Sequence, residues 1–217
     1  MSSTHSFSED IRFRMTPTER RLKRAFDVLF ALVGIATIWP LMALLCIILF
    51  IGGGRHVFYK QERQGLGGRV FNILKFRTMK VNAEVDVPRL ERPGDPRLTR
   101  IGAVLRRHHL DELPQLWNVL RGDMSVVGPR PERPYFVRLI TERDPRYPAL
   151  FQIRPGLTSE ATLVNGYTDN IEKMTRRLEF DLDYLRHATL GGDMRLILRT
   201  IRVVICGDKR PIKQSPK

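Results

Sequence analysis

The sequence predicts a mainly α-helical protein with one small β-hairpin, in which an N-terminal membrane helix precedes a compact domain. Three observations predict this class. Residues 28–51 form an uncharged run of 24, which as a helix would reach about 36 Å against a hydrocarbon core of about 30 Å. Two short β-type runs flank a glycine-rich turn at residues 65–68. Apolar residues with helical spacing recur through much of the remaining chain.

The composition indicates one domain with an appended membrane segment. The chain has 217 residues, a formal net charge of +14 and two cysteines. This length is typical of one domain, and the charge predicts anionic partners such as nucleic acid, anionic lipid or phosphorylated substrates. Two cysteines far apart predict neither a disulfide framework nor a metal cluster. We expect a flexible segment at 1–19, the membrane helix at 20–54, the compact domain at 55–207 and a loose tail at 208–217.

The apolar run permits two topologies. Pro40 lies near its middle, where a proline removes a helical hydrogen bond and bends the helix. A kinked helix can still span a membrane. Both flanks are basic, however, and positive flanks favour the cytoplasm, so a re-entrant hairpin also satisfies the sequence. The flanking cations are Arg20, Arg21, Lys23 and Arg24 before the run and Arg55, Lys60 and Arg63 after it.

The first elements of the domain follow directly. Glycines 52–54 end the membrane helix. Residues 57–59 and 70–74 are rich in β-branched and aromatic side chains and predict two strands. No Gly-Lys-Ser/Thr follows the glycines at 65–68, so we expect a hairpin turn there rather than a phosphate-binding loop. Residues 81–97 hold several prolines and charges, which is typical of a surface loop.

Four helices are predicted beyond that loop, and a two-faced helix follows them near the C-terminus. The four ranges are residues 98–107, 111–121, 131–143 and 170–188. In residues 194–206, Arg195, Arg199 and Arg202 recur at i, i+4 and i+7 and share one helix face. Such a helix suits the surface of an anionic membrane. An ordinary core helix with a solvated stripe would show the same pattern.

Asp111 and Glu112 are the leading candidates for chemistry. Pro114 is tolerated only in a first helical turn, because later turns need the N–H that it lacks. The two carboxylates therefore lie at or just before a helix N-terminus, which favours anions. One could attack phosphorus as a nucleophile while the other binds Mg²⁺, which prefers one or two carboxylates together with substrate phosphates. The alternative is an N-cap aspartate followed by a first-turn acid.

The side chains near this pair favour a phosphate substrate. Arginines surround it, and guanidinium groups bind phosphate through paired hydrogen bonds. They are Arg106 and Arg107 before the pair and Arg121, Arg130 and Arg133 after it. His108 and His109 suggest zinc as an alternative. Zinc is disfavoured because adjacent histidines seldom point at one metal and no His-x3-His spacing is present.

Several separate motifs give the chain a resemblance to a known family. Residues 110–131, LDELPQLWNVLRGDMSVVGPRP, are similar to the central signature of the bacterial sugar transferases, the monotopic phosphoglycosyl transferases. The resemblance covers about residues 20–205. Other segments agree in the same order: 23–27 (KRAFD), 61–65 (QERQG), 75–79 (KFRTM), 95–102 (DPRLTRIG) and 154–158 (RPGLT).

The resemblance implies an enzyme that transfers a phosphosugar from a UDP-sugar to polyprenyl (undecaprenyl) phosphate and releases UMP. This would be the first membrane step of envelope glycan, exopolysaccharide or glycoprotein glycan synthesis. It implies that Asp111 attacks to form a covalent phosphosugar intermediate and that Glu112, together with Asp111, binds Mg²⁺. The expected phosphate contacts are Lys75, Arg77, Arg106, Arg130 and Arg154.

The resemblance also implies a fold and a location. It implies a re-entrant helix–break–helix in the membrane, a cytoplasmic catalytic domain and interfacial amphipathic helices. The protein would then be monotopic, in contact with inner-membrane lipid on the cytoplasmic face. Trp39 precedes Pro40, whereas many members have serine there. Ser159, Glu160 and Thr162 replace a usual glycine, aromatic residue and glutamine, which leaves the sugar open.

Two other classes of function are alternatives. A basic nucleic-acid-binding protein would explain the net charge. The basic residues are spread along the chain, however, and Asp111 and Glu112 would repel a phosphate backbone without metal, so we expect no nucleic-acid partner. A non-catalytic scaffold at the membrane would retain the fold without turnover. The sequence leaves a homo-oligomer open.

Overall fold

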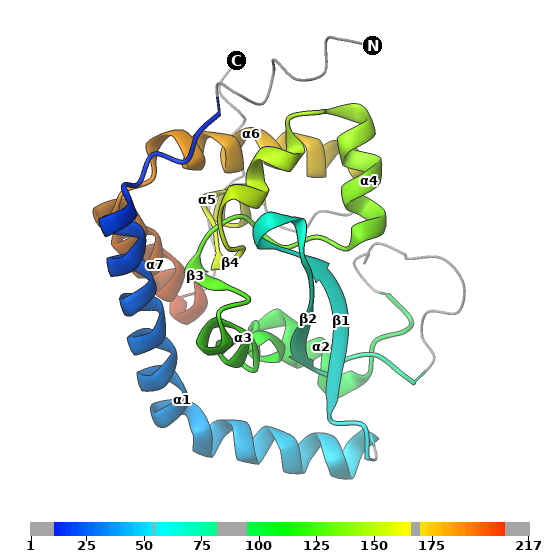
Figure 1. Ribbon diagram of the computed structural model, residues 1–217. Coiled ribbons are helices and arrows are strands. Elements are labelled where there is room, and N and C mark those ends of the chain that lie inside the picture. Colours follow the sequence, from blue (N-terminus) through cyan, green and yellow to red (C-terminus); the bar gives the residue numbers. More distant parts are fainter. Residues whose placement is uncertain (1–10, 54, 82–94, 166–169, 207–217) are drawn as a thin grey trace.

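The computed structural model describes residues 11–53, 55–81, 95–165 and 170–206, and helices dominate them (Figure 1). This confirms the predicted class, mainly α with a small β-hairpin. The helices are α1 (Pro17–Gly53), α2 (Arg100–Arg107), α3 (Gln115–Arg121), α4 (Pro134–Arg143), α5 (Glu160–Asn165), α6 (Ile171–His187) and α7 (Leu190–Cys206). The strands are β1 (Phe58–Gln64), β2 (Val70–Phe76), β3 (Ser125–Val127) and β4 (Gly156–Thr158). Short 3-10 turns are η1 (Leu66–Gly68), η2 (Leu110–Glu112) and η3 (Tyr147–Gln152).

Helix α1 is the one described helix long and apolar enough to cross a membrane, with a mean hydropathy of 2.5 in its most apolar window. It ends at the predicted glycines. Figure 1 shows that it bends sharply about midway. Pro40 lies inside the helix, and the Thr37 hydroxyl donates to the carbonyl of Val33 at 2.8 Å. A missing N–H and a side chain that hydrogen-bonds to the preceding turn both bend a helix, so the bend has a local cause.

Both halves of α1 pack against the same folded unit. In the first half, Asp27 accepts hydrogen bonds from the Ser125 hydroxyl and the Val126 N–H. In the second half, Leu45 and Leu49 are buried in one cluster with side chains of β2 and α2. Figure 1 shows the remaining elements within the inner angle of the bent helix. Most other large apolar side chains of α1 are exposed, so its outer surface is apolar.

The predicted hairpin is confirmed, and its strands are longer than expected. β1 and β2 pair antiparallel from Phe58 opposite Phe76 to Gln64 opposite Val70. Gly67 and Gly68 in the connection have φ of 65° and 73°, which glycine adopts without strain. The backbone of the turn therefore requires glycine at these two positions.

A second sheet was not predicted. β3 and β4 pair parallel, with Ser125 opposite Gly156 and Val127 opposite Thr158. A side chain at Gly156 would collide with the backbone of Gly128, and one at Gly128 would collide with the backbone at Arg154 and Gly156. This close approach joins the Gly-Pro-Arg-Pro segment to the later Arg-Pro-Gly segment and fixes both.

The expectation of a flexible segment over residues 1–19 is wrong for residues 11–19. Ile11, Phe13 and Met15 are buried in the largest hydrophobic cluster, with side chains of α4, η3 and α6. The Arg14 N–H donates to the Leu185 carbonyl at 3.0 Å, and α1 begins at Pro17. Alternate apolar residues of an extended segment point to one side, and that side is covered here. Residues 1–10 and the tail at 208–217 lie outside the described residues.

The other predicted helices are present with small shifts. α2, α4 and α6 match the ranges 98–107, 131–143 and 170–188, and α7 contains residues 194–206. The expected helix over 111–121 is divided into η2 and α3. α5 was not predicted. The expected surface loop at 81–97 lies mostly outside the described residues, which resume at residue 95.

Candidate active site

The turn that carries Asp111 and Glu112 is held on the second half of α1. Both residues lie in η2, and their neighbours Leu110 and Leu113 pack against the cluster that contains Leu45 and Leu49. Pro114 follows as the N-cap residue of α3, in agreement with the prediction from its missing N–H. The two carboxylates are therefore placed directly beside the apolar helix.

The backbone before the pair is in a rare conformation. His109 has φ 54° and ψ 20°, which is the left-handed region, and it is the one described non-glycine residue with positive φ. A residue with a β-carbon is strained there by about 1–2 kcal/mol. His109 lies two residues before Asp111, and its left-handed conformation turns the chain from α2 into η2.

Glu112 is held by two cations. Its Oε1 accepts from Lys75 Nζ at 2.9 Å and from an Arg130 guanidinium N–H at 3.0 Å. Burial disfavours the charged carboxylate, but the attraction of Lys75 and Arg130 outweighs it and holds the pKa of Glu112 well below its usual range. Glu112 is therefore ionised at neutral pH, and it brings β2 and the Gly-Pro-Arg-Pro segment together at the pair.

Asp111 is buried but accepts no hydrogen bond from any residue that the structure describes. It is 5% exposed. Burial raises the pKa of its carboxyl group and Glu112 raises it further, against the attraction of Lys75 and Arg106. A carboxylate in this setting keeps its lone pairs for a ligand. The contrast with Glu112 separates the two acids: one is already paired, and the other is available.

Arg106 reaches the same place from α2. Its Nε donates to the Thr78 hydroxyl at 2.8 Å, and its charge lowers the pKa of Asp111. α2 lies against residue 78 so closely that a side chain at Gly102 would overlap the Thr78 carbonyl. Lys75, Arg106 and Arg130, three of the five predicted phosphate contacts, thus surround the acidic pair.

The other two predicted contacts lie elsewhere. Arg77 Nε donates to the His56 carbonyl at 3.1 Å, and its guanidinium lies over the Tyr59 ring. Arg154 Nε donates to the Gly122 carbonyl at 2.8 Å. Gly122 caps the C-terminus of α3, whereas the acids precede its N-terminus. In this structure Arg154 binds the negative end of α3, where a cation is stabilising.

Sequence reasoning missed the buried group that fixes Arg130. Glu132, two residues later, pairs with Arg177 of α6 and with Arg63 of β1, the latter at 3.3 Å. Arg63 also donates to the Pro131 carbonyl at 3.0 Å. These partners are distant in sequence and follow no local pattern. Only the charge of Glu132 beside two prolines could have drawn attention to it.

The described residues contain no group of three or more His, Cys, Asp or Glu side chains arranged to hold a metal. Mg²⁺ does not need such a group, because one or two carboxylates and substrate phosphates complete its shell. Asp111 offers a carboxylate without hydrogen bonds from the described residues, and Glu112 is bonded through Oε1 alone. The pair therefore fits Mg²⁺ that arrives with a diphosphate.

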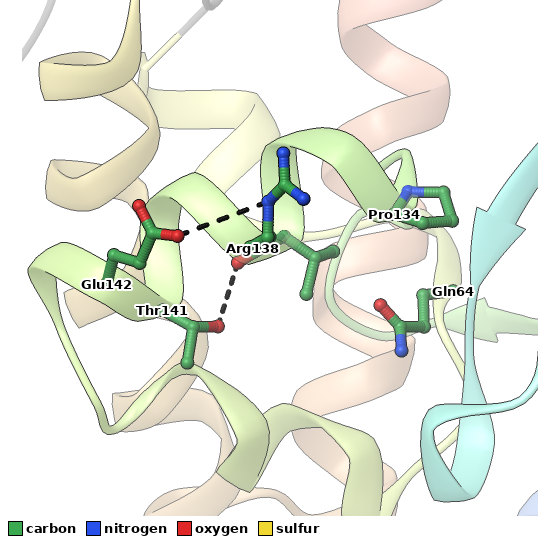
Figure 2. Close-up of a pocket in the computed structure, with 6 residues that line it drawn as sticks. Gln64, Pro134, Arg138, Thr141 and Glu142 are labelled. Carbon is green, nitrogen blue, oxygen red and sulfur yellow. Dashed lines mark hydrogen bonds and ion pairs between the residues drawn. The ribbon is translucent and has the colours of Figure 1, made fainter.

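An open depression lies on α4, away from the acids. Figure 2 shows Arg138 and Glu142 on one side of it and Gln64 on another. The ion pair between Arg138 and Glu142 is long, at 4.0 Å, and both side chains are more than 60% exposed. In Figure 1, α4 lies apart from α2 and α3. The residues that line this depression do not include a pair of adjacent carboxylates.

Comparison with known proteins gives consistent matches. The family model described as bacterial sugar transferase matches residues 18–207. A UDP-glucose:undecaprenyl-phosphate glucose-1-phosphate transferase of Caulobacter vibrioides is 41% identical over 189 residues, which are 86% of this chain and 70% of that protein. A UDP-N-acetylgalactosamine-undecaprenyl-phosphate N-acetylgalactosaminephosphotransferase of Aeromonas hydrophila is 36% identical over 192 residues, or 88% of this chain and 45% of that protein.

A third relative has the same coverage pattern. A UDP-glucose:undecaprenyl-phosphate glucose-1-phosphate transferase of Escherichia coli is 35% identical over 190 residues, which are 86% of this chain and 41% of that protein. The chain thus spans less than half the length of the Aeromonas and Escherichia proteins. The matched region includes the acidic pair and all its cationic neighbours.

Proposed function

The chain belongs to the bacterial sugar transferase family, and we propose that it transfers a phosphosugar from a UDP-sugar to polyprenyl phosphate with release of UMP. The observation that carries this proposal is the asymmetry of the acidic pair. Glu112 is paired with Lys75 and Arg130, whereas Asp111 is buried beside the same cations with its carboxylate available. The relatives are named for undecaprenyl phosphate and UDP-sugars, which supports the same substrate class here.

Asp111 is the nucleophile in this proposal. A carboxylate oxygen of Asp111 attacks the β-phosphorus of the UDP-sugar, and the bond from that phosphorus to the bridging oxygen breaks, so UMP leaves with the electron pair. The product is an acyl phosphate that carries the sugar. A phosphate oxygen of polyprenyl phosphate then attacks the same phosphorus, and the Asp111 carboxylate leaves. No net oxidation or external proton donor is required.

The cations position and stabilise the diphosphate. Lys75 and Arg130 converge on Glu112 from two elements, and Arg106 approaches Asp111 from a third. Charge that develops on a transferring phosphoryl group is stabilised by fixed cations in a partly buried site. We assign Glu112 the role of keeping Lys75 and Arg130 in place beside the nucleophile. Arg77 and Arg154 have no position in this group.

Mg²⁺ is proposed as the cofactor, held by Glu112 and Asp111 together with the substrate phosphates. When bound it neutralises the diphosphate and acts as a Lewis acid. The protein's part is to keep two adjacent carboxylates ionised at a partly buried position. EDTA should then stop turnover and added Mg²⁺ restore it, and full activity in rigorously metal-free buffer would exclude the assignment.

We propose that α1 enters and leaves the membrane on one side. Its first half bonds to β3 and to the C-terminus of α3, where Arg24 donates to the Val119 carbonyl at 2.7 Å. Its second half packs on β2 and α2 through Leu45 and Leu49. The packing of both halves against one folded unit supports a topology in which both ends of α1 lie on the same side of the membrane. The proposed location is the cytoplasmic face of the bacterial inner membrane, because both flanks are basic.

Helix α7 extends this membrane contact. Met194, Leu198 and Ile201 are exposed and recur with helical spacing, and Arg195 and Arg202 are exposed beside them. An exposed apolar stripe flanked by arginines suits an anionic bilayer surface. The side chains of Val204, Ile205 and Cys206 lie outside the description. The nucleophile would then lie near the headgroup level, where a lipid phosphate is found.

The function is tested with radiolabelled UDP-sugar. Wild-type protein should carry label on Asp111 and transfer it to undecaprenyl phosphate in detergent, with UMP as the second product. An amide cannot replace the carboxylate as nucleophile, so Asp111→Asn should show no label and no transfer. Substantial transfer by this variant would exclude the covalent mechanism. A panel of UDP-glucose, UDP-galactose and UDP-N-acetylgalactosamine would then identify the sugar.

The topology is tested separately. Single cysteines at Thr16→Cys and Arg55→Cys, in a background without Cys46 and Cys206, should both react with an impermeant maleimide from the cytoplasmic side of inverted vesicles. Reaction of only one of them would show that α1 spans the membrane.

A further inference from the structure

One face of the chain from η2 into α3 lies along strand β2. Glu112, Gln115 and Asn118 are spaced three residues apart and share this face. Glu112 bonds to Lys75 of β2 at 2.9 Å. Asn118 accepts from the Leu74 N–H at 2.9 Å and donates to the Asn72 carbonyl at 2.8 Å. Gln115 therefore faces β2 between these two anchored positions.

The two amides on this face differ in one respect. Asn118 is 2% exposed, and its side chain makes hydrogen bonds through both its oxygen and its nitrogen. Gln115 is 3% exposed, and its Nε2 is fully buried with no hydrogen-bond partner among the described residues. No described residue bonds to its side-chain oxygen either, and that oxygen is not among the buried atoms without a partner. Buried polar groups are normally paired.

We propose that Gln115 is a substrate-binding residue whose side-chain NH2 donates a hydrogen bond to a phosphate oxygen of the bound sugar nucleotide. The inference rests on the proposed transferase function and adds a residue to that site. Gln115 lies one turn after Asp111 and Glu112, and the cations Lys75 and Arg130 already mark where an anion would lie. A missing partner for an NH2 group must be an acceptor, and the acceptor that these cations attract is a phosphate oxygen.

A neutral donor suits this position. A further lysine or arginine would form an ion pair with Asp111, and an ion-paired nucleophile would be less reactive. A glutamine amide bonds to phosphate without adding charge, so the Asp111 carboxylate stays unpaired. In the unliganded protein the buried NH2 is unsatisfied and destabilising. A ligand phosphate that satisfies it recovers this loss, which favours binding at this residue.

The test compares stability with ligand response in the full-length protein. Gln115→Met keeps the volume and removes the donor, so the unliganded melting temperature should stay equal or rise. The kcat/KM for the UDP-sugar should fall about 10- to 100-fold, the size expected for one hydrogen bond to a charged group. UDP should raise the melting temperature of wild type more than uridine does, and this difference should shrink in Gln115→Met.

A matched control lies three residues later. Asn118→Leu removes an amide whose hydrogen bonds are all within the protein, so its unliganded melting temperature should fall. A comparable fall for Gln115→Met, or failure of that variant to fold, would show a structural role and overturn the proposal, as would kcat/KM within twofold of wild type. Absence of UMP release by the wild-type protein would instead overturn the transferase function itself, and the comparison of UDP with uridine would still report on Gln115.

Discussion

Two glutamates, Glu112 and Glu132, are each held by two cations, yet their surroundings differ. The cluster of Glu132, Arg63 and Arg177 is closed: the side chains of Glu132 and Arg177 are 5% and 4% exposed. The cluster of Glu112, Lys75 and Arg130 is open: Arg130 is 33% exposed, and beside it lies Asp111, which accepts no hydrogen bond from the described part of the chain. The closed cluster satisfies its charges within the protein, whereas the open one leaves places for a substrate.

The two clusters therefore have different roles, one in supporting the backbone and one in positioning a side chain. The Gln64 N–H donates to the Glu132 carbonyl at 2.9 Å, and Arg63 donates to the Pro131 carbonyl at 3.0 Å. The closed cluster thereby fixes the backbone of the two residues that directly follow Arg130. The open cluster holds the side chain of Arg130 beside Asp111, the proposed nucleophile. One buried ionic group supports the geometry of the other.

The largest predicted effect on stability is at the closed cluster. Glu132→Gln removes the carboxylate that Arg63 and Arg177 share and leaves Arg177 only its longer contact with Asp181 at 3.8 Å, so the free energy of unfolding should fall by about 3–5 kcal/mol. Glu112→Gln should lower it by only about 1 kcal/mol, because the more exposed Arg130 can turn to solvent, while kcat/KM falls about 100-fold or more. Chemical denaturation and UMP release measure the two quantities. Equal losses of stability would erase the distinction between the clusters.

A second prediction concerns the pH dependence of the closed cluster. Burial raises the pKa of Asp181 to about 7, against the attraction of Arg177. The unfolded value is about 3.9, so between pH 4 and 7 the folded protein binds the proton more tightly. Asp181 therefore makes stability fall as pH rises through this window, by roughly 2–4 kcal/mol in all.

The measurement uses Asp181→Asn, which stays neutral at every pH. Denaturation curves of wild type and variant at pH 5, 6, 7 and 8 should diverge, and the variant should lose less stability than wild type as the pH increases. The contributions of groups that do not interact with Asp181 cancel in the difference. Parallel pH profiles for the two proteins would show that Asp181 does not titrate in this window.

The sequence predicted elements with strong local signals. The apolar run, its glycine end and the kink at Pro40 follow from the properties of the residues themselves, and so does the position of Asp111 and Glu112 before a helix. The buried segment at residues 11–15 was missed although apolar residues alternate there, because an extended stretch next to a terminus has the same pattern whether or not a core covers it.

Pairings distant in sequence could not be predicted. β3 and β4 lie about thirty residues apart in the sequence. Each has only three residues, and a strand of that length is too short to show a period-2 pattern. The partner of Glu132 is Arg177, 45 residues later. Charge alone did not distinguish the arginines beside the acidic pair from those that stabilise helix ends. Only packing separates Arg130 from Arg154.

That distinction gives a third prediction. Arg154→Ala removes the hydrogen bond to the Gly122 carbonyl, so the free energy of unfolding should fall by about 1.5–3 kcal/mol, with KM for the UDP-sugar unchanged. Arg130→Ala should change stability less and raise KM or lower kcat. Steady-state kinetics and denaturation of both variants decide this. A raised KM for Arg154→Ala with normal stability would return Arg154 to the phosphate contacts.

The smallest predicted effect is at the exposed ion pair on α4. Arg138 and Glu142 lie 4.0 Å apart with side chains 68% and 64% exposed, so Glu142→Gln should change the free energy of unfolding by no more than about 0.5 kcal/mol. The comparison with Glu132→Gln is direct, because each change neutralises one glutamate paired with an arginine. A loss at Glu142 as large as that at Glu132 would mean that burial does not set the strength of these pairs. The division into a closed supporting cluster and an open reactive one would then lose its physical basis, since it rests on which charges are withdrawn from water.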